Sequence, residues 1–450
     1  MSLTSAMRTA LLKVMLPVVF TRLACRVRCT RAYRLDGRAI TVLNEARRVL
    51  VTRLLSLWFA FMLMLYAGQS WSQQHGHSEP KAPALAVSAA FDAKGSLWLV
   101  GWHGPGALYL RRVLDQGRRV DDAKRLINVS GDAVSASGEN RPKIKFGLQG
   151  QMLISYTKPL AKPYTGEIRM VRSEDGGLSF SEPFTVHHDR QEITHRFDSI
   201  IVDRDGVLHT FWIDKRDQAL IRDSKKLKHR ELAKHYRGAA IYRNESFDAG
   251  LTFGPDIKVA DHSCECCRIA LTLDRAGKPV AMWRHVFAPN LRDHAVWRWL
   301  APHEIHRASE DGWQLDACPH HGPSIALASD GGFHAVWYGE REGLAAVRYG
   351  KLNDKGLPAA TPVVLPDRAA EHADVLRQGS TLVMTWQVFD GQRSIWKAWV
   401  SQDEGRQFTS LVLGEHLGKH DYPILVGSPS EGIWAVWNTD QGLRLRKIDS

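Results

Sequence analysis

One short pattern occurs three times in this chain of 450 residues. The pattern is Ser-x-Asp-x-Gly-x-x-Phe, and its copies span residues 173–180, 246–253 and 401–408. An Asp side chain at the tip of a tight turn accepts backbone N–H groups, and Gly two positions later allows a positive φ. The closing Phe returns the chain to the apolar interior. Three such turns indicate a chain built from repeated structural units, which restricts the fold before any catalytic question arises.

A second landmark recurs along the chain: a short apolar strand that ends in an aromatic residue. The closing aromatic residues are Trp102, Tyr156, Trp212, Trp283, Trp337, Trp386 and Trp437. Each of these strands follows an earlier apolar run and a Gly-bearing turn, which predicts an antiparallel hairpin. Seven hairpins at a spacing of roughly 50 residues predict an all-β propeller of four-stranded antiparallel blades. Seven blades are favoured, and six blades are the alternative.

The repeated turns resemble the Asp boxes, or BNR repeats, of the sialidase superfamily, where they lie on the outer hairpins of a β-propeller. Degenerate copies of the pattern appear at residues 115–117, 309–313 and 354–356. The resemblance covers residues 84–450 and implies a sialidase-like propeller. The Phe/Tyr-Arg-Ile-Pro motif that begins sialidase catalytic domains is missing, so the resemblance implies a divergent member.

The last repeat ends too early to form a complete blade, because little sequence follows residue 447. We expect residues 75–85 to supply its fourth strand. Such a strand would close the ring and cover an open sheet edge, which otherwise invites aggregation.

The N-terminal region has the form of an export signal. Basic residues precede an apolar core at 53–67, and the small residues Ser70 and Ser72 precede a predicted cleavage site before Gln73. We predict a signal peptide over residues 51–72 and one propeller domain over 73–450, periplasmic or secreted. An uncleaved anchor is the alternative, and cleavage would leave no stable membrane insertion. Residues 1–50 are Arg-rich, and we interpret them as a mis-assigned or unstructured extension.

The formal net charge of +12 overstates the charge of the predicted propeller. Residues 1–72 hold 11 Lys and Arg but only 2 Asp and Glu. Subtracting them from the totals of 60 and 48 leaves 49 basic and 46 acidic residues, a net charge of +3. The composition therefore gives no reason to expect a nucleic-acid partner. We expect a monomer.

The residues that open the innermost strand of each blade surround the axis on one face, and the Asp boxes fall on the opposite face. These openings are rich in His, Cys, Arg and Asp. They span residues 140–143, 195–198, 264–268, 318–323, 372–374 and 420–423. Because a rigid scaffold gathers such loops, we predict a functional site at the centre of this face.

Four cysteines remain after residue 72, and they fall at two adjacent openings. With two neighbouring histidines they form a soft ligand set suited to copper first and zinc second. The predicted metal ligands are Cys264, Cys266, Cys267, Cys318, His320 and His321. Two structural disulfides between adjacent blades are the main alternative in an oxidising compartment, and a reactive thiol is another. The histidines at 262, 285 and 294 lie on the same side of the fourth blade.

The sialidase resemblance also implies an exo-glycosidase that acts on an acidic sugar. Sialidases use three arginines for the substrate carboxylate, an Asp as acid/base and a Tyr–Glu pair as nucleophile. The matching residues here are Arg141, Arg196 and Arg268 for the clamp, Asp198 as acid/base and Tyr422 as nucleophile, with Glu265 as the nearest partner for the tyrosine.

Three functions are therefore open, of which the metal-binding propeller is favoured. The glycosidase is the second, and a binding scaffold for carbohydrate or protein without chemistry is the third. An insertion at 220–237 predicts a short helix on the functional face, because its leucines form one weak apolar stripe.

Overall fold

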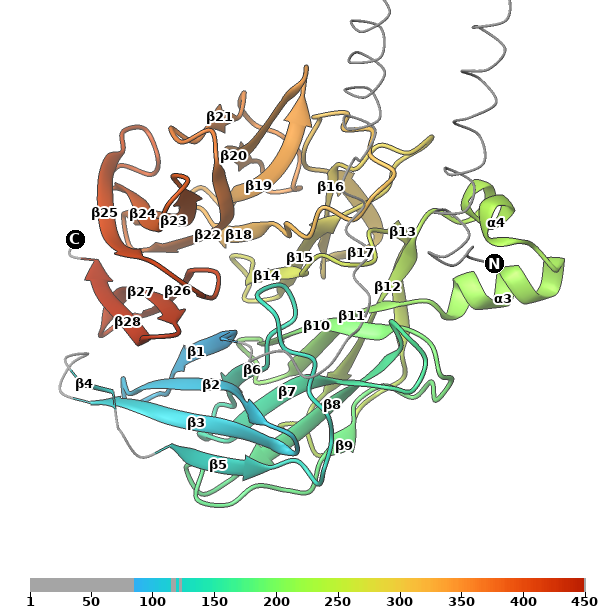
Figure 1. Cartoon of the computed structure of the whole chain (residues 1–450), viewed down its shortest axis with the longest axis horizontal. Helices are drawn as coiled ribbons and strands as arrows, with labels where there is room; N and C mark the ends of the chain where they lie inside the picture. The colour runs from blue at the N-terminus through green and yellow to red at the C-terminus, as the bar shows by residue number, and fades with distance from the viewer. Residues whose placement is uncertain (1–84, 115–118, 121–123, 449–450) are drawn as a thin grey trace, which may run out of the picture. The chain divides into compact units, whose positions relative to one another are not determined.

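A computed structural model describes residues 85–114, 119–120 and 124–448. They form seven antiparallel sheets that follow one another along the chain (Figure 1). The first three blades consist of β1 (Val87–Phe91), β2 (Leu97–Gly104), β3 (Ala107–Leu114), β4 (Arg119–Val120) and β5 (Arg125–Asn128); β6 (Lys143–Phe146), β7 (Met152–Pro159), β8 (Gly166–Ser173) and β9 (Phe184–Thr185); and β10 (His195–Val202), β11 (Leu208–Asp214), β12 (Ala239–Ser246) and β13 (Ile257–Ser263).

The remaining four blades have the same antiparallel order. They consist of β14 (Ala270–Leu273), β15 (Pro279–Arg284), β16 (His294–Arg298) and β17 (Ala301–Arg307); β18 (Ser324–Leu327), β19 (Phe333–Arg341), β20 (Leu344–Leu352) and β21 (Val363–Val364); β22 (Ala370–Gln378), β23 (Thr381–Phe389), β24 (Ser394–Ser401) and β25 (Thr409–His416); and β26 (Ile424–Ser428), β27 (Gly432–Thr439) and β28 (Gly442–Ile448).

The seven sheets close into a ring. The innermost strands β1, β6, β10, β14, β18, β22 and β26 each contact the next in this order, and β26 also contacts β1. The predicted seven-bladed all-β propeller is therefore confirmed, and the six-bladed alternative is wrong.

A buried ion pair ties the two ends of the ring together. The Asp421 carboxylate accepts the backbone N–H of Val87 at 2.9 Å and a guanidinium N–H of Arg141 at 3.0 Å. Asn438 also donates to the carbonyl of Leu85 at 2.7 Å. The seventh blade has three strands within the described residues, and the predicted closing strand at 75–85 lies almost wholly outside them.

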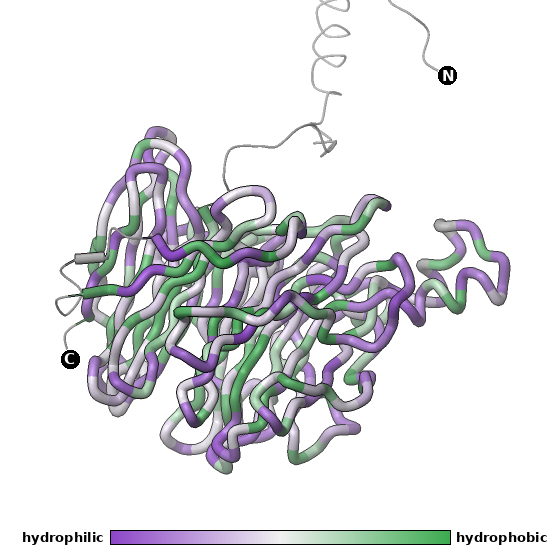
Figure 2. Tube along the Cα trace, turned by 90° about the horizontal axis from the view of Figure 1, so that it is seen from below, coloured by the Kyte–Doolittle hydropathy of each residue, from purple (hydrophilic) through white to green (hydrophobic). Residues whose placement is uncertain are grey.

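The closing aromatic residues form much of the core between the blades. Trp212, Trp283, Trp386 and Trp437 are completely buried, and so is Tyr156. Burying an indole calls for a partner for its N–H, and neighbouring chain atoms supply one for Trp212, Trp386 and Trp437; Trp386, for example, donates to the Asp367 carboxylate at 3.0 Å. The indole N–H of Trp283 has no partner among the described residues. Apolar and polar residues alternate along much of the trace (Figure 2).

The predicted Asp turns have the expected geometry. In the first copy, Asp175 Oδ1 accepts the N–H groups of Leu178 and Ser179 at 2.9 Å, and Gly177 has a φ of 79°. The other two copies make the same bonds through Asp248 and Asp403. All three join the third and fourth strands of a blade, so these carboxylates hold turns.

The degenerate copies behave differently. Residues 309–313 do not form this turn, because they follow the fourth strand β17 at the opposite end of the blade. There Asp311 is buried and accepts the indole N–H of Trp337 at 2.7 Å. In the copy at 354–356 the turn is held by Asn353, which accepts two N–H groups at 3.0 Å. Residues 115–117 lie outside the described residues.

The insertion in the third blade forms two helices instead of the single predicted one. They are α3 (Arg216–Lys225) and α4 (His229–His235), and they project from the propeller between β11 and β12 (Figure 1). Neither these helices nor any other in the described residues is long and apolar enough to cross a bilayer. The predicted signal peptide falls outside the described residues.

Candidate functional site

The openings of the inner strands contain unusual backbone conformations. Phe197, His320 and His372 have φ values of 56°, 54° and 51°, in the left-handed region that non-glycine residues rarely adopt. Phe197 and His372 lie at register shifts of β10 and β22. Strained backbone of this kind is found at functional sites, but Ala249 and Glu404 in the Asp turns also have positive φ, so this feature alone does not locate the site.

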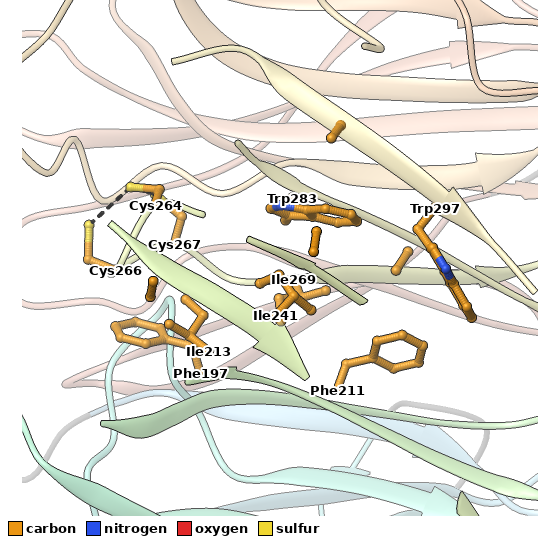
Figure 3. Packing of buried hydrophobic residues seen from close by; sticks show 14 residues of the cluster. Phe197, Phe211, Ile213, Ile241, Cys264, Cys266, Cys267, Ile269, Trp283 and Trp297 are labelled. Atoms are coloured by element: carbon orange, nitrogen blue, oxygen red, sulfur yellow. Dashed lines mark hydrogen bonds between the residues drawn. The ribbon is translucent and has the colours of Figure 1, made fainter. Parts of the chain in front are cut away.

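Three cysteines come together at the opening of the fourth blade (Figure 3). The sulfur of Cys264 lies 3.7 Å from that of Cys266 and 3.8 Å from that of Cys267, and all three sulfurs lie within 4.8 Å of one another. All three side chains are buried. These distances are far longer than a disulfide bond of about 2.05 Å, and the four cysteines of the described chain are free thiols.

The fourth cysteine comes from the next blade. Cys318 is exposed, and its sulfur is not part of the group of three that lie within 4.8 Å of one another, although it interacts electrostatically with Cys264 and Cys266. Hydrogen bonds with Cys266 and Cys267, together with the interaction with Cys318, hold the pKa of Cys264 well below its usual range, although burial alone would raise it. The bond to Cys264 raises the pKa of Cys266 and of Cys267. The group therefore favours one thiolate shared among these cysteines.

Three arginines face this cluster. Arg292 donates to the sulfur of Cys264 at 3.4 Å, Arg284 interacts electrostatically with Cys264, and Arg196 interacts with Cys266. Within the described part of the chain, none of the three has a carboxylate within 4.0 Å. Their positive charges are therefore available to thiolates.

The predicted histidine ligands do not join the three sulfurs. His320 is exposed. The ring of His321 stacks between those of Tyr338 and His372, with centroids 4.3 Å and 4.2 Å away. A different imidazole interacts with the cysteines. His294 is completely buried and interacts electrostatically with Cys264, and its Nε2 has no hydrogen-bond partner among the described residues.

A cavity of about 230 Å³ lies among the inner strands. Its lining includes three of the five predicted catalytic residues, Arg141, Arg268 and Tyr422. The other two, Arg196 and Asp198, are not among its lining residues.

The predicted arginine clamp does not converge on one point. Arg141 is bonded to Asp421, and Arg268 to Glu139 at 2.7 Å. Asp198 is buried and accepts Lys143 at 3.1 Å, with two hydroxyl donors as well. Both carboxylate oxygens of Asp198 therefore accept hydrogen bonds from other side chains of the protein. The prediction of Asp198 as acid/base did not anticipate these bonds.

Glu139, which sequence reasoning missed, is one of two carboxylates that line the cavity, the other being Asp374. It is only 4% exposed. Its Oε2 accepts the backbone N–H groups of Arg268 and Gly322, both at 2.9 Å, and His372 Nδ1 lies 3.5 Å from Oε1. Burial alone raises the pKa of Glu139, but Arg268 and His372 outweigh this effect and lower it. No spacing pattern marks this residue, because its partners lie in distant loops.

Tyr422 lies against the same group. Its ring stacks on that of His372 with centroids 3.3 Å apart, and burial followed by the charge of Glu139 raises the pKa of its hydroxyl to about 12. The partner suggested from sequence, Glu265, instead pairs with Lys215. Among the carboxylates that act on the Tyr422 hydroxyl, Glu139 has the largest effect, ahead of Asp421 and Glu371.

Comparison with known proteins supports the architecture. No protein-family model matches the chain. No curated protein matches it either. Solved structures that are similar include an ulvan lyase (10% identity, 81% of this chain and 92% of that chain, TM-score 0.50) and the Hadza microbial sialidase Hz136 (14%, 77% and 74%, 0.45). A Penicillium chrysogenum α-L-arabinanase is 13% identical, with 73% and 92% covered and a TM-score of 0.46. At such identities the likeness concerns the fold alone.

Proposed function

We propose that this protein is a metal-binding propeller whose site consists of Cys264, Cys266 and Cys267 with Cys318 as fourth ligand. The observation that carries the proposal is the spacing of the sulfurs. A tetrahedral zinc ion with Zn–S bonds of about 2.3 Å places its sulfurs about 3.8 Å apart. The sulfur of Cys264 lies 3.7 and 3.8 Å from its two neighbours.

The ligand set favours zinc over copper(I), which the sequence alone placed first. Structural zinc sites are closed by four ligands, and Cys318 of the neighbouring loop is the thiol that would complete the three gathered here. Copper(I) also prefers thiolates, and it is the second candidate. Location in the periplasm or outside the cell and the monomeric state remain predictions from sequence.

The test is metal content and thiol count on one preparation of the full chain. We expect one equivalent of zinc, which protects the thiols from modification until a chelator is added. The Cys266→Ser variant should bind zinc at least tenfold more weakly. His320→Ala is the matched control, because this exposed imidazole lies outside the sulfur group and the variant should keep its zinc. Protein that binds neither zinc nor copper would overturn the proposal.

A second candidate is glycosidase chemistry at the cavity on the axis. The observation in its favour is that Tyr422, Glu139 and Arg268 line one cavity. A tyrosine oxygen beside a carboxylate can act as a nucleophile. Release of fluorophore from a panel of aryl glycosides, including a sialoside, tests it. Activity that survives Tyr422→Phe unchanged would contradict this assignment.

A further inference from the structure

Two loops connect the cysteine cluster to the cavity on the axis. The first carries three cysteines and continues directly into Arg268, and the second carries Cys318 and continues into Gly322. After one intervening residue in each case, the inner strands β14 and β18 begin at Ala270 and Ser324. Each loop therefore holds cysteine ligands at one end and part of the cavity at the other.

Both loops bond the same carboxylate. Glu139 Oε2 accepts the N–H of Arg268 from the first loop and the N–H of Gly322 from the second. The guanidinium of Arg268 then bridges the loops, because it donates to the carbonyl of Pro323 at 3.1 Å as well as to Glu139. The position of Glu139 thus depends on the spacing between the two loops.

The packing at this junction leaves no space for adjustment. A Cβ placed on Gly322 would lie 2.3 Å from Arg268 Cγ and 2.7 Å from Glu139 Oε2. A third link comes from buried Arg284, which interacts with Cys264 and donates to the carbonyl of His321 at 2.8 Å. The ring of His321 stacks on that of His372, and the ring of His372 stacks on that of Tyr422.

From this arrangement we propose that metal bound by the cysteines positions the cavity around Glu139, and that the cavity binds one small neutral polyhydroxylated molecule, such as a single sugar ring. This inference rests on the proposed metal site. When Cys318 and Cys267 share one metal ion, the two loops are fixed at one separation, and so are the N–H groups that orient Glu139.

The ligand class follows from the charges that face the cavity. The side chains of Arg141, Lys143 and Arg268 are each paired with a carboxylate within 4.0 Å. The fourth cation of the lining, Lys145, interacts with Asp374. The positive charges of the lining are therefore balanced by carboxylates, and no net charge remains to attract an anion. The serine hydroxyls and the paired charged groups offer hydrogen-bond donors and acceptors to the hydroxyl groups of a neutral ligand. A volume of about 230 Å³ limits the ligand to a small molecule.

Hydrogen exchange with and without zinc tests the coupling. We compare peptides covering 136–146, 264–271 and 318–325 in the zinc-loaded protein, after chelation, and in Cys318→Ser. The inference expects at least tenfold faster exchange in all three regions when the metal ligands are disrupted, with the outer strands unchanged. A change confined to the cysteine loops would overturn the coupling. Equally faster exchange in all seven blades would also overturn it, because the metal would then hold the whole fold.

Saturation-transfer NMR tests the ligand class on the zinc-loaded chain. The probes are glucose and galactose as neutral sugars, with glucuronate and N-acetylneuraminate as acidic ones. We expect a signal from a neutral sugar that Glu139→Gln abolishes while the zinc content stays at one equivalent. Binding of the acidic sugars alone, or of none of the four, would refute the ligand class. Absence of zinc would instead refute the proposed metal site itself.

Discussion

Replacement of Glu139 by Gln tests the site on the axis through stability. The side chain is buried, bonds two backbone N–H groups and pairs with Arg268 at 2.7 Å. A Gln side chain has nearly the same shape as Glu but carries no charge. Its amide NH2 is a donor, and it would point at a backbone N–H or at the Arg268 guanidinium, which are also donors. Removing one partner of a buried ion pair costs about 3–5 kcal/mol. We therefore expect Glu139→Gln to lower the free energy of unfolding by about 3–5 kcal/mol at pH 7.

Urea denaturation followed by tryptophan fluorescence measures this change. Glu174→Gln is the matched control, because Glu174 also pairs with an arginine, Arg172, at 2.9 Å while its side chain is 68% exposed. Exposed pairs contribute about 0–1 kcal/mol, so the control should unfold nearly like the wild type.

Acid provides an independent check on the same residue. Burial acts to raise the pKa of Glu139, but Arg268 and His372 bring it below the unfolded value. A carboxylate with a depressed folded pKa stabilises the protein above its unfolded pKa of about 4.3, and this contribution is lost as pH falls towards the folded pKa. The difference between wild type and Glu139→Gln should therefore shrink below about pH 4. A difference under about 1 kcal/mol at pH 7, or one that grows in acid, would refute the reasoning.

Three further predictions concern other parts of the molecule. Gly322→Ala should destabilise the protein by about 1–3 kcal/mol through overpacking, while Gly104→Ala, where a Cβ meets nothing within 4 Å, should not; equal urea midpoints would contradict this. Burial and then His195 lower the pKa of His187 to about 2, so the unfolded state binds the extra proton and stability falls below pH 6.5 by about 1.4 kcal/mol per pH unit. His187→Gln should flatten that slope between pH 6.5 and 5.5, and an unchanged slope would count against it. The pKa of Asp248 is lowered to about 2 because bonds within its turn outweigh burial, so the destabilisation by Asp248→Asn should be complete at pH 7 and vanish near pH 2; a pH-independent difference in melting temperature would contradict it.

The fold was predictable because every repeat carries its own local signals. A Gly turn and a closing aromatic residue mark each hairpin, so the number of blades follows from counting them. The interval between the closing residues Trp212 and Trp283 is longer than the others, because α3 and α4 are inserted between β11 and β12. The number of blades could still be predicted, because the rest of that blade keeps the repeated pattern. The copy at 309–313 was misassigned because a short Asp-Gly pattern does not reveal at which end of a blade it lies.

The candidate site was only partly predictable. The cysteines could be placed together because adjacent blades bring adjacent openings together. Glu139 could not be found, because its bonds to Arg268 and Gly322 span 129 and 183 residues and no local pattern announces them. His321 was expected as a ligand from its position beside Cys318. Its ring instead stacks on His372, an outcome decided by side-chain packing and not by chain position.

The arginines around the cysteines distinguish the metal site from the disulfide alternative. Two disulfides would remove every thiolate charge from the cluster and leave Arg196, Arg284 and Arg292 without an anionic partner in the described chain. An uncompensated buried cation is costly, and Arg284 is only 1% exposed. Four thiolates around a divalent ion keep a net charge of about −2 beside these guanidinium groups. If the disulfide alternative were correct, Arg284→Met should stabilise the oxidised protein; with the metal site, the same variant should weaken zinc binding, and competition with a chelator separates the two outcomes.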